Sequence, residues 1–146
     1  MQRRDLPRIL NIEAASFGRD AWRREAFLEA LENCSDLFFI ARTSGRIAGY
    51  SISCIERGRA ELISIAVLPE FRGRGVARAL IAAAIASAHD RRIGSVRLMV
   101  EVGNDAAIAL YRRLGFYRLW TVPNYYGKGR NGWRMELLLR GRRGRD

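Results

Sequence analysis

The feature that most constrains this chain is an alanine-rich run between two stretches of strand character. Residues 76–90 are dominated by strong helix formers. Residues 60–67 before the run and 96–102 after it are rich in apolar and β-branched residues, which are typical of strands. A helical crossover of this kind places the two strands parallel and next to each other. The sequence therefore predicts an α/β fold with two adjacent parallel strands.

The other elements follow from apolar spacing and turn residues. We expect three strands to form an antiparallel meander, because Ser44-Gly45 and Arg57-Gly58 are turn pairs. Asn104 is expected to cap a short helix that closes at Gly115. The predicted elements other than those above are helices over residues 6–17 and 22–33, strands over 37–43 and 47–56, and final strands over 116–122 and 133–139.

The size of the chain bounds its organisation. At 146 residues, with 49% hydrophobic and 28% charged residues, it has the length and composition of one folded domain. We expect that domain to cover residues 1–139 and residues 140–146 to be a basic, disordered tail. No signal peptide pattern opens the chain, and no apolar run approaches the roughly 20 residues that cross a membrane.

The cysteines and the single histidine do not indicate a metal site. Cys34 and Cys54 lack the spacing of a zinc site or a C-x-x-C motif, and His89 lies in the alanine-rich run. We therefore expect no metal, and a cytoplasmic protein in which both thiols are free.

The formal charge of +11 comes almost entirely from arginine, since Lys128 is the one lysine among 26 basic residues. Two interpretations remain open. The charge can reflect arginine-rich codon usage and a solvated surface, or it can attract an anionic cofactor or a ribonucleoprotein.

A loop with the features of an anion site precedes the alanine-rich helix. Pro69 ends the preceding strand, and Gly73 and Gly75 then lead into a helix that opens at Val76. The first turn of a helix presents unpaired N–H groups and a partial positive charge, and glycine lets a phosphate approach the backbone closely. A plain strand-to-helix turn is the alternative interpretation of the glycine pair.

Two motifs of the chain, one in this loop and one after the next predicted strand, resemble those of the GNAT superfamily of acetyltransferases. Arg72-x-x-Gly75-x-Ala77 is similar to the R/Q-x-x-G-x-G/A signature that binds acetyl-CoA, and residues 104–116 are similar to the N-x-x-A-I-x-L-Y-x-x-x-G-F segment. The similarity covers nearly the whole chain and extends in particular to bacterial ribosomal-protein alanine N-acetyltransferases and other protein N-terminal acetyltransferases. It implies a mixed, mostly antiparallel sheet of six to seven strands that splays at the parallel pair, with about four helices on both faces.

The resemblance also assigns roles to individual residues. It implies that Tyr111 protonates the departing thiolate, that Asn104 touches the cofactor, and that an amide near Val67 polarises the thioester carbonyl. The alternatives are a helix cap for Asn104 and a buried aromatic side chain for Tyr111. The residues expected to contact acetyl-CoA are Ile65, Ala66, Val67, Arg72, Gly73, Arg74, Gly75, Val76, Ala77, Asn104 and Tyr111.

The general base is less well defined. In the enzymes that this chain resembles, the strand after the alanine-rich helix has a sequence similar to L-E-V-R, whereas this chain has Leu98-Met99-Val100-Glu101. Met99 therefore replaces their glutamate. Glu101, on the same face of the strand, and Glu61, in a stretch similar to that of histone acetyltransferases, are the two candidates. Either can instead be a solvent-facing charge, and a water chain without a dedicated base is the third possibility.

The resemblance places the acceptor site near Trp22, Phe27, Tyr125 and Tyr126. Trp22 and Phe27 can equally belong to the helix core, and the two tyrosines to an exposed loop. The first hypothesis is that the acceptor is the α-amine of a protein N-terminus, for example that of a ribosomal protein. The second hypothesis is a small amine or amino acid. A hypothesis of another class is a basic nucleic-acid-binding module without catalysis. No nucleic-acid recognition motif accompanies the positive charge, so we expect no specific nucleic acid as a partner. We also expect no membrane partner.

Overall fold

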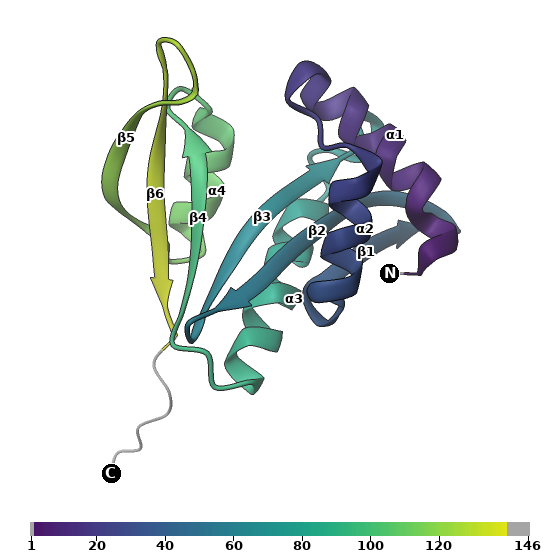
Figure 1. Ribbon diagram of the computed structural model, residues 1–146, viewed down its shortest axis with the longest axis horizontal. Coiled ribbons are helices and arrows are strands. Elements are labelled where there is room, and N and C mark those ends of the chain that lie inside the picture. The colour runs from purple at the N-terminus through teal and green to yellow at the C-terminus, as the bar shows by residue number, and fades with distance from the viewer. Residues whose placement is uncertain (1, 140–146) are drawn as a thin grey trace. The chain divides into compact units, whose positions relative to one another are not determined.

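The computed structural model describes residues 2–139, which contain four α-helices and six strands (Figure 1). The α-helices are α1 (Leu6–Phe17), α2 (Arg24–Asn33), α3 (Val76–Asp90) and α4 (Asp105–Arg113). The strands are β1 (Phe38–Thr43), β2 (Arg46–Glu56), β3 (Arg59–Val67), β4 (Ser95–Glu101), β5 (Tyr117–Gly127) and β6 (Arg130–Leu138). Short 3-10 helices cover Arg3–Asp5, Gly18–Asp20, Ser35–Leu37 and Pro69–Phe71. The predicted tail over residues 140–146 lies outside the described residues.

The strands form a mixed sheet in the order β1-β2-β3-β4-β6-β5. Residues 59–62 of β3 pair in parallel with residues 95–98 of β4, whereas β1 with β2, β4 with β6, and β5 with β6 pair antiparallel. The predicted α/β class and its parallel strand pair are therefore confirmed. Connection by α3 forces the parallel direction, because a short hairpin can join only antiparallel strands.

The described chain divides into two compact units that alternate along the sequence. The first consists of residues up to Cys54 together with Ile63–Ser87, and the second of Ile55–Leu62 together with the residues from Ala88 onward. The single domain over residues 1–139 stays a prediction.

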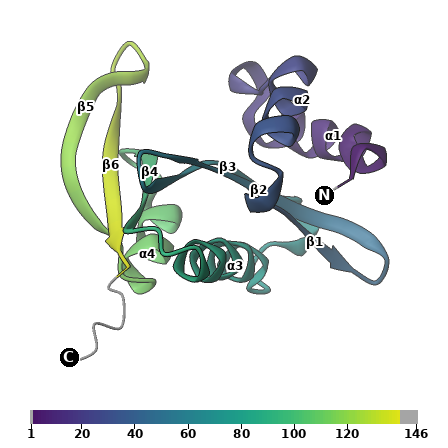
Figure 2. The same cartoon turned by 60° about the horizontal axis from the view of Figure 1, so that its bottom comes forward.

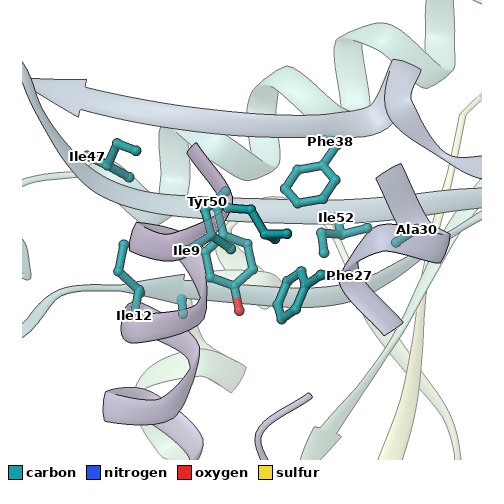
Figure 3. Close-up of a cluster of buried hydrophobic side chains, with 10 residues drawn as sticks. Ile9, Ile12, Phe27, Ala30, Phe38, Ile47, Tyr50 and Ile52 are labelled. Carbon is teal, nitrogen blue, oxygen red and sulfur yellow. The ribbon is translucent and has the colours of Figure 1, made fainter. Parts of the chain in front are cut away.

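In the first unit, α1 and α2 lie on one side of the strands and α3 on the other (Figure 2). Two hydrophobic clusters reflect this arrangement. One packs Ile9 of α1 and Phe27 of α2 against Tyr50 of β2 (Figure 3), and the other packs Leu80 of α3 against Ala48 and Val67. Because burial of apolar side chains is the main driving force of folding, these two clusters fix both helical layers on the strands.

In the second unit, the buried apolar side chains of β4 occupy alternate positions, namely Val96, Leu98 and Val100. This period of two is expected of a strand with one covered face. Strand β5 is mostly exposed and lies at the edge of the sheet, where Pro123 is tolerated because an edge strand has unpaired positions. The alternative interpretation that places Tyr125 and Tyr126 in a loop is wrong, since β5 continues to Gly127.

The expectation of two free thiols is also wrong. Cys34, directly after α2, and Cys54, in β2, form a disulfide with their Cα atoms 5.0 Å apart. The sequence spacing did not show this, because only the packing of α2 on β2 brings the two side chains together.

Reduction of this disulfide is expected to lower the free energy of unfolding. A closed loop of about 20 residues removes conformational entropy from the unfolded chain worth about 3 kcal/mol. Urea denaturation with and without a thiol reductant measures the difference, and Cys34→Ser gives the same comparison without reductant. Coinciding denaturation curves would show that the crosslink does not form or does not matter.

Candidate active site

The end of β3 lies unusually close to β2. A Cβ atom on Gly49 would stand only 2.6 Å from the carbonyl oxygen of Ala66 and 3.2 Å from the Cα of Val67, so the position requires glycine. The amide of Leu68 donates to the carbonyl of Ala48 at 2.8 Å. Gly49 thus sets the backbone of Ala66 and Val67, the predicted thioester region. Sequence reasoning missed Gly49, because nothing local marks a close approach between strands.

The predicted diphosphate loop follows directly. Gly73 and Gly75 have φ of +76° and +79°, which side chains rarely adopt, and no heavy atom lies within 4 Å of where a Cβ would stand at either position. The loop residues from Arg72 to Gly75 are exposed, and α3 begins at Val76. The first amides of α3 have no partner within the helix, so a diphosphate has both access and donors.

Arginines surround this loop and play different roles. The Nε of Arg72 donates to the carbonyl of Val67 at 3.0 Å, which ties the loop to the end of β3. The guanidinium groups of Arg74 and Arg46 lie over the ring of Phe71, 5.9 and 5.1 Å from its centre. Arg74 is thereby held at the loop as a counter-charge, whereas Arg46, which the sequence did not single out, is paired with Glu70 at 3.1 Å.

In the second unit, Asn104 and Tyr111 are placed by α4. The side chain of Asn104 caps the helix by accepting a hydrogen bond from the amide of Ala107 at 3.3 Å. Tyr111 is only 7% exposed and meets the ring of Phe116 edge-on. Burial raises the pKa of Tyr111 to about 12, so its phenol stays protonated and remains a hydrogen-bond donor at physiological pH.

The rings of Tyr125 and Tyr126 make an edge-to-face contact, with 4.9 Å between their centres. A Cβ on Gly132 would lie 2.8 Å from the Cε of Met99 and 3.2 Å from each tyrosine, so these three side chains converge on that glycine. Burial raises the pKa of Tyr126, and nearby Tyr125, Tyr111 and Glu101 raise it further. The second unit therefore brings together the predicted residues Tyr111, Tyr125, Tyr126 and Glu101.

Both candidate bases are engaged by arginine. Arg130 donates to both carboxylate oxygens of Glu101 at 2.9 Å, and this hydrogen bonding lowers the pKa of Glu101. Arg134 donates to Glu61 at 2.6 Å. A general base for an amine works best with a pKa near the operating pH, so the pairing of Glu101 opposes that role.

Trp22 and Phe27 differ in accessibility. Phe27 is fully buried, so it forms core and presents no surface to a ligand, contrary to its predicted role in the acceptor site. Trp22 is half-buried, and its ring lies 5.2 Å from that of Phe27. Trp22 is therefore the accessible member of the pair.

The buried phenol of Tyr111 gives a pH-dependent contribution to stability. Its pKa is about 12 in the folded protein and 10.0 when exposed, so folding favours the protonated form. The contribution, about 3 kcal/mol, is present below pH 10 and is lost as the pH rises through 12. Ultraviolet titration of tyrosinate should show one late-ionising phenol fewer in Tyr111→Phe than in the wild type. Equal titration curves would contradict this.

With this geometry in view, the comparisons with known proteins identify the class. A sequence profile described as the acetyltransferase (GNAT) family matches residues 6–116. The chain therefore belongs to the GNAT family and is an acetyl-CoA-dependent N-acetyltransferase.

Individual relatives agree with the family. The chain is 37% identical over 131 residues to the N-alpha-acetyltransferase RimI of Mycobacterium tuberculosis, covering 86% of this chain and 81% of that protein. An uncharacterized protein of Mycobacterium leprae is 35% identical to the chain over 127 residues. This match covers 84% of the present chain but only 34% of the Mycobacterium leprae protein. The structure of Ard1 from Thermoplasma volcanium superimposes with a TM-score of 0.90 at 25% identity, covering 96% of this chain and 95% of that one.

No helix within residues 2–139 combines the length and the apolar character needed to cross a membrane. Within the same residues, histidine, cysteine and acidic side chains form no group of three or more that could hold a metal ion.

Proposed function

We propose that this enzyme acetylates the α-amine of a protein N-terminus. The observation that carries the proposal is the 37% identity to an N-alpha-acetyltransferase over most of both chains. Tyr125 and Tyr126, both at least partly accessible, supply the kind of aromatic surface that grips the first residues of a peptide. A ribosomal protein is a proposed substrate, since the Bacillus subtilis relative is named for acetylation of ribosomal protein bS18.

The loop before α3 and the end of β3 hold the cofactor in this proposal. Acetyl-CoA supplies an activated acetyl thioester. The amides at the start of α3 and the loop from Arg72 to Gly75 bind its diphosphate. The backbone of Ile65, Ala66 and Val67 lines the acyl arm, and one amide there polarises the thioester carbonyl.

Tyr111 is the proton donor in this proposal. The phenol of Tyr111 is protonated at neutral pH and donates a hydrogen bond to the sulfur as negative charge develops on it. A thiol has a pKa near 8.5, well below that of Tyr111, so the phenol stabilises the developing thiolate by a hydrogen bond, and net proton transfer to the sulfur is unfavourable. Asn104 caps the N-terminus of α4 and thereby helps to fix the position of Tyr111 on that helix.

Water serves as the proton acceptor in this proposal. The amine must lose a proton before it attacks, because it is mostly an ammonium ion at neutral pH. Glu101 and Glu61 are each paired with arginine, and Met99 has no basic group. A water chain without a dedicated base is therefore the proposed route.

We also propose that the enzyme works in the cytoplasm, where ribosomal proteins are made. The disulfide between Cys34 and Cys54 runs against this placement, because disulfides are rare in a reducing compartment. Activity is therefore to be measured with and without a reductant.

The test is acetyl transfer from radiolabelled acetyl-CoA to a library of N-terminal peptides. A polyamine and amino-acid panel and peptides with a blocked α-amine but a free lysine run in parallel. We expect label only on free α-amines. Transfer to the small amines alone would support the second acceptor hypothesis, which the replacement of the expected glutamate by Met99 favours.

A further inference from the structure

Glu13, near the end of α1, is a buried acid with no role in the proposed chemistry. Its side chain lies within the hydrophobic core of the first unit, and the residue is 1% exposed. Carboxylates are rarely found in such places, because removal from water is costly unless hydrogen bonds replace the lost hydration. Burial accordingly raises the pKa of Glu13.

Three donors from different segments converge on this carboxylate. The backbone amide of Trp22 donates to Oε2 at 2.9 Å. The hydroxyl of Tyr50 donates to Oε1, and the hydroxyl of Ser64 donates to the same oxygen at 3.2 Å. Glu13 thereby connects the segment between α1 and α2 with strands β2 and β3.

A second route links the same residues through their rings. Trp22 contacts Phe27 at 5.2 Å, and Phe27 meets Tyr50 edge-on at 5.7 Å. Figure 3 shows the Tyr50 oxygen pointing away from β2 toward the helices. Trp22 is thus held by its backbone through Glu13 and by its ring through Phe27.

The segment from Gly18 to Arg23 joins α1 to α2. Gly18 has φ of +52°, and the amide of Ala21 donates to the carbonyl of Gly18 at 3.1 Å, a contact within the segment itself. The bond to Glu13 connects this backbone to a neighbouring element. Ser64 also directly precedes Ile65, where the predicted thioester region begins.

We infer that Glu13 is a positioning residue, whose carboxylate holds Trp22 and its segment in place for the acceptor and keeps that segment in register with the end of β3. The inference deepens the proposed function and rests on it for the identity of the acceptor. It assigns no proton transfer to Glu13, which is sealed from solvent.

The test compares two substitutions of Glu13. Glu13→Ala leaves the amide of Trp22 and two hydroxyls without their acceptor, so the KM for an N-terminal peptide should rise at least about tenfold. Glu13→Gln keeps an oxygen for Trp22, and its KM should stay within about threefold of the wild type. The Kd of coenzyme A should be unchanged in both variants, because Glu13 does not touch the diphosphate loop.

Hydrogen exchange gives a readout that does not depend on activity. Exchange at the Trp22 amide should accelerate at least about tenfold in Glu13→Ala and be preserved in Glu13→Gln. If Glu13→Ala fails to fold, Tyr50→Phe removes one donor but keeps the ring contacts, and it should raise the peptide KM by a smaller factor. Asp5→Asn is the matched control, since Asp5 is a buried acid bonded to Gln2 and Arg42 at the other end of α1, and its peptide KM should not change.

Three results would overturn the inference. They are a folded Glu13→Ala with an unchanged peptide KM, an unchanged exchange rate at Trp22, and a parallel loss of peptide and coenzyme A binding, which indicates general loosening. If the wild type acetylates no N-terminal peptide, the proposed acceptor is wrong, and the exchange rate at Trp22 still decides whether Glu13 holds the segment.

Discussion

Replacement of Gly75 by glutamate is expected to raise the Kd of coenzyme A by at least about 100-fold while the protein stays folded. Gly75 has φ of +79°, and the space beside its Cα is open. A carboxylate there would lie at the start of α3, where the amides and arginines are arranged for a diphosphate, and like charges at close range repel strongly. Titration calorimetry at low salt measures the loss directly.

Gly45→Glu is the matched control for this substitution. Gly45 has the same φ of +79° and the same open surroundings, but it lies in the turn between β1 and β2. Both variants incur the cost of a side chain in the left-handed region, about 1–2 kcal/mol. Only Gly75→Glu should lose coenzyme A binding. If both variants bind coenzyme A like the wild type, the loop does not hold the diphosphate.

Tyr111→Phe is expected to lower kcat roughly 100-fold and to leave the Kd of acetyl-CoA nearly unchanged. The substitution keeps the ring, its burial and its contact with Phe116, and it removes only the hydroxyl. Loss of a positioned proton donor typically costs two to four orders of magnitude in rate. Single-turnover acetyl transfer separates this chemical step from product release.

Tyr117→Phe provides the comparison, because it also removes one hydroxyl from the second unit. That hydroxyl donates to Glu136 at 3.1 Å, away from the predicted chemistry. We expect its kcat to stay close to the wild-type value. Equal turnover in Tyr111→Phe and the wild type would remove Tyr111 from the mechanism and leave it a core residue.

Much of the fold and the cofactor loop could be predicted from the sequence because these features are local. Helix formers in residues 76–90 fix α3, and Pro69, Gly73 and Gly75 dictate the backbone before it. The parallel pairing of β3 and β4 then follows from the crossover rule.

The surroundings of the predicted catalytic residues could not be found in this way. Glu61 and Glu101 are alike as sequence letters, yet each meets an arginine supplied by the C-terminal strand β6. Phe27 has the helical spacing of either a core or a binding residue, and only the packing of α2 places it in the core.

What the sequence by itself determined is the order of elements and the backbone of the loop before α3, because conformational preferences of neighbouring residues decide these. Its two motifs indicated the family. The tertiary structure alone decided the joining of Cys34 to Cys54, the close approach at Gly49, and the three donors that meet Glu13. Each depends on side chains far apart in the chain, and no local preference encodes which distant partner a folded core will bring within reach.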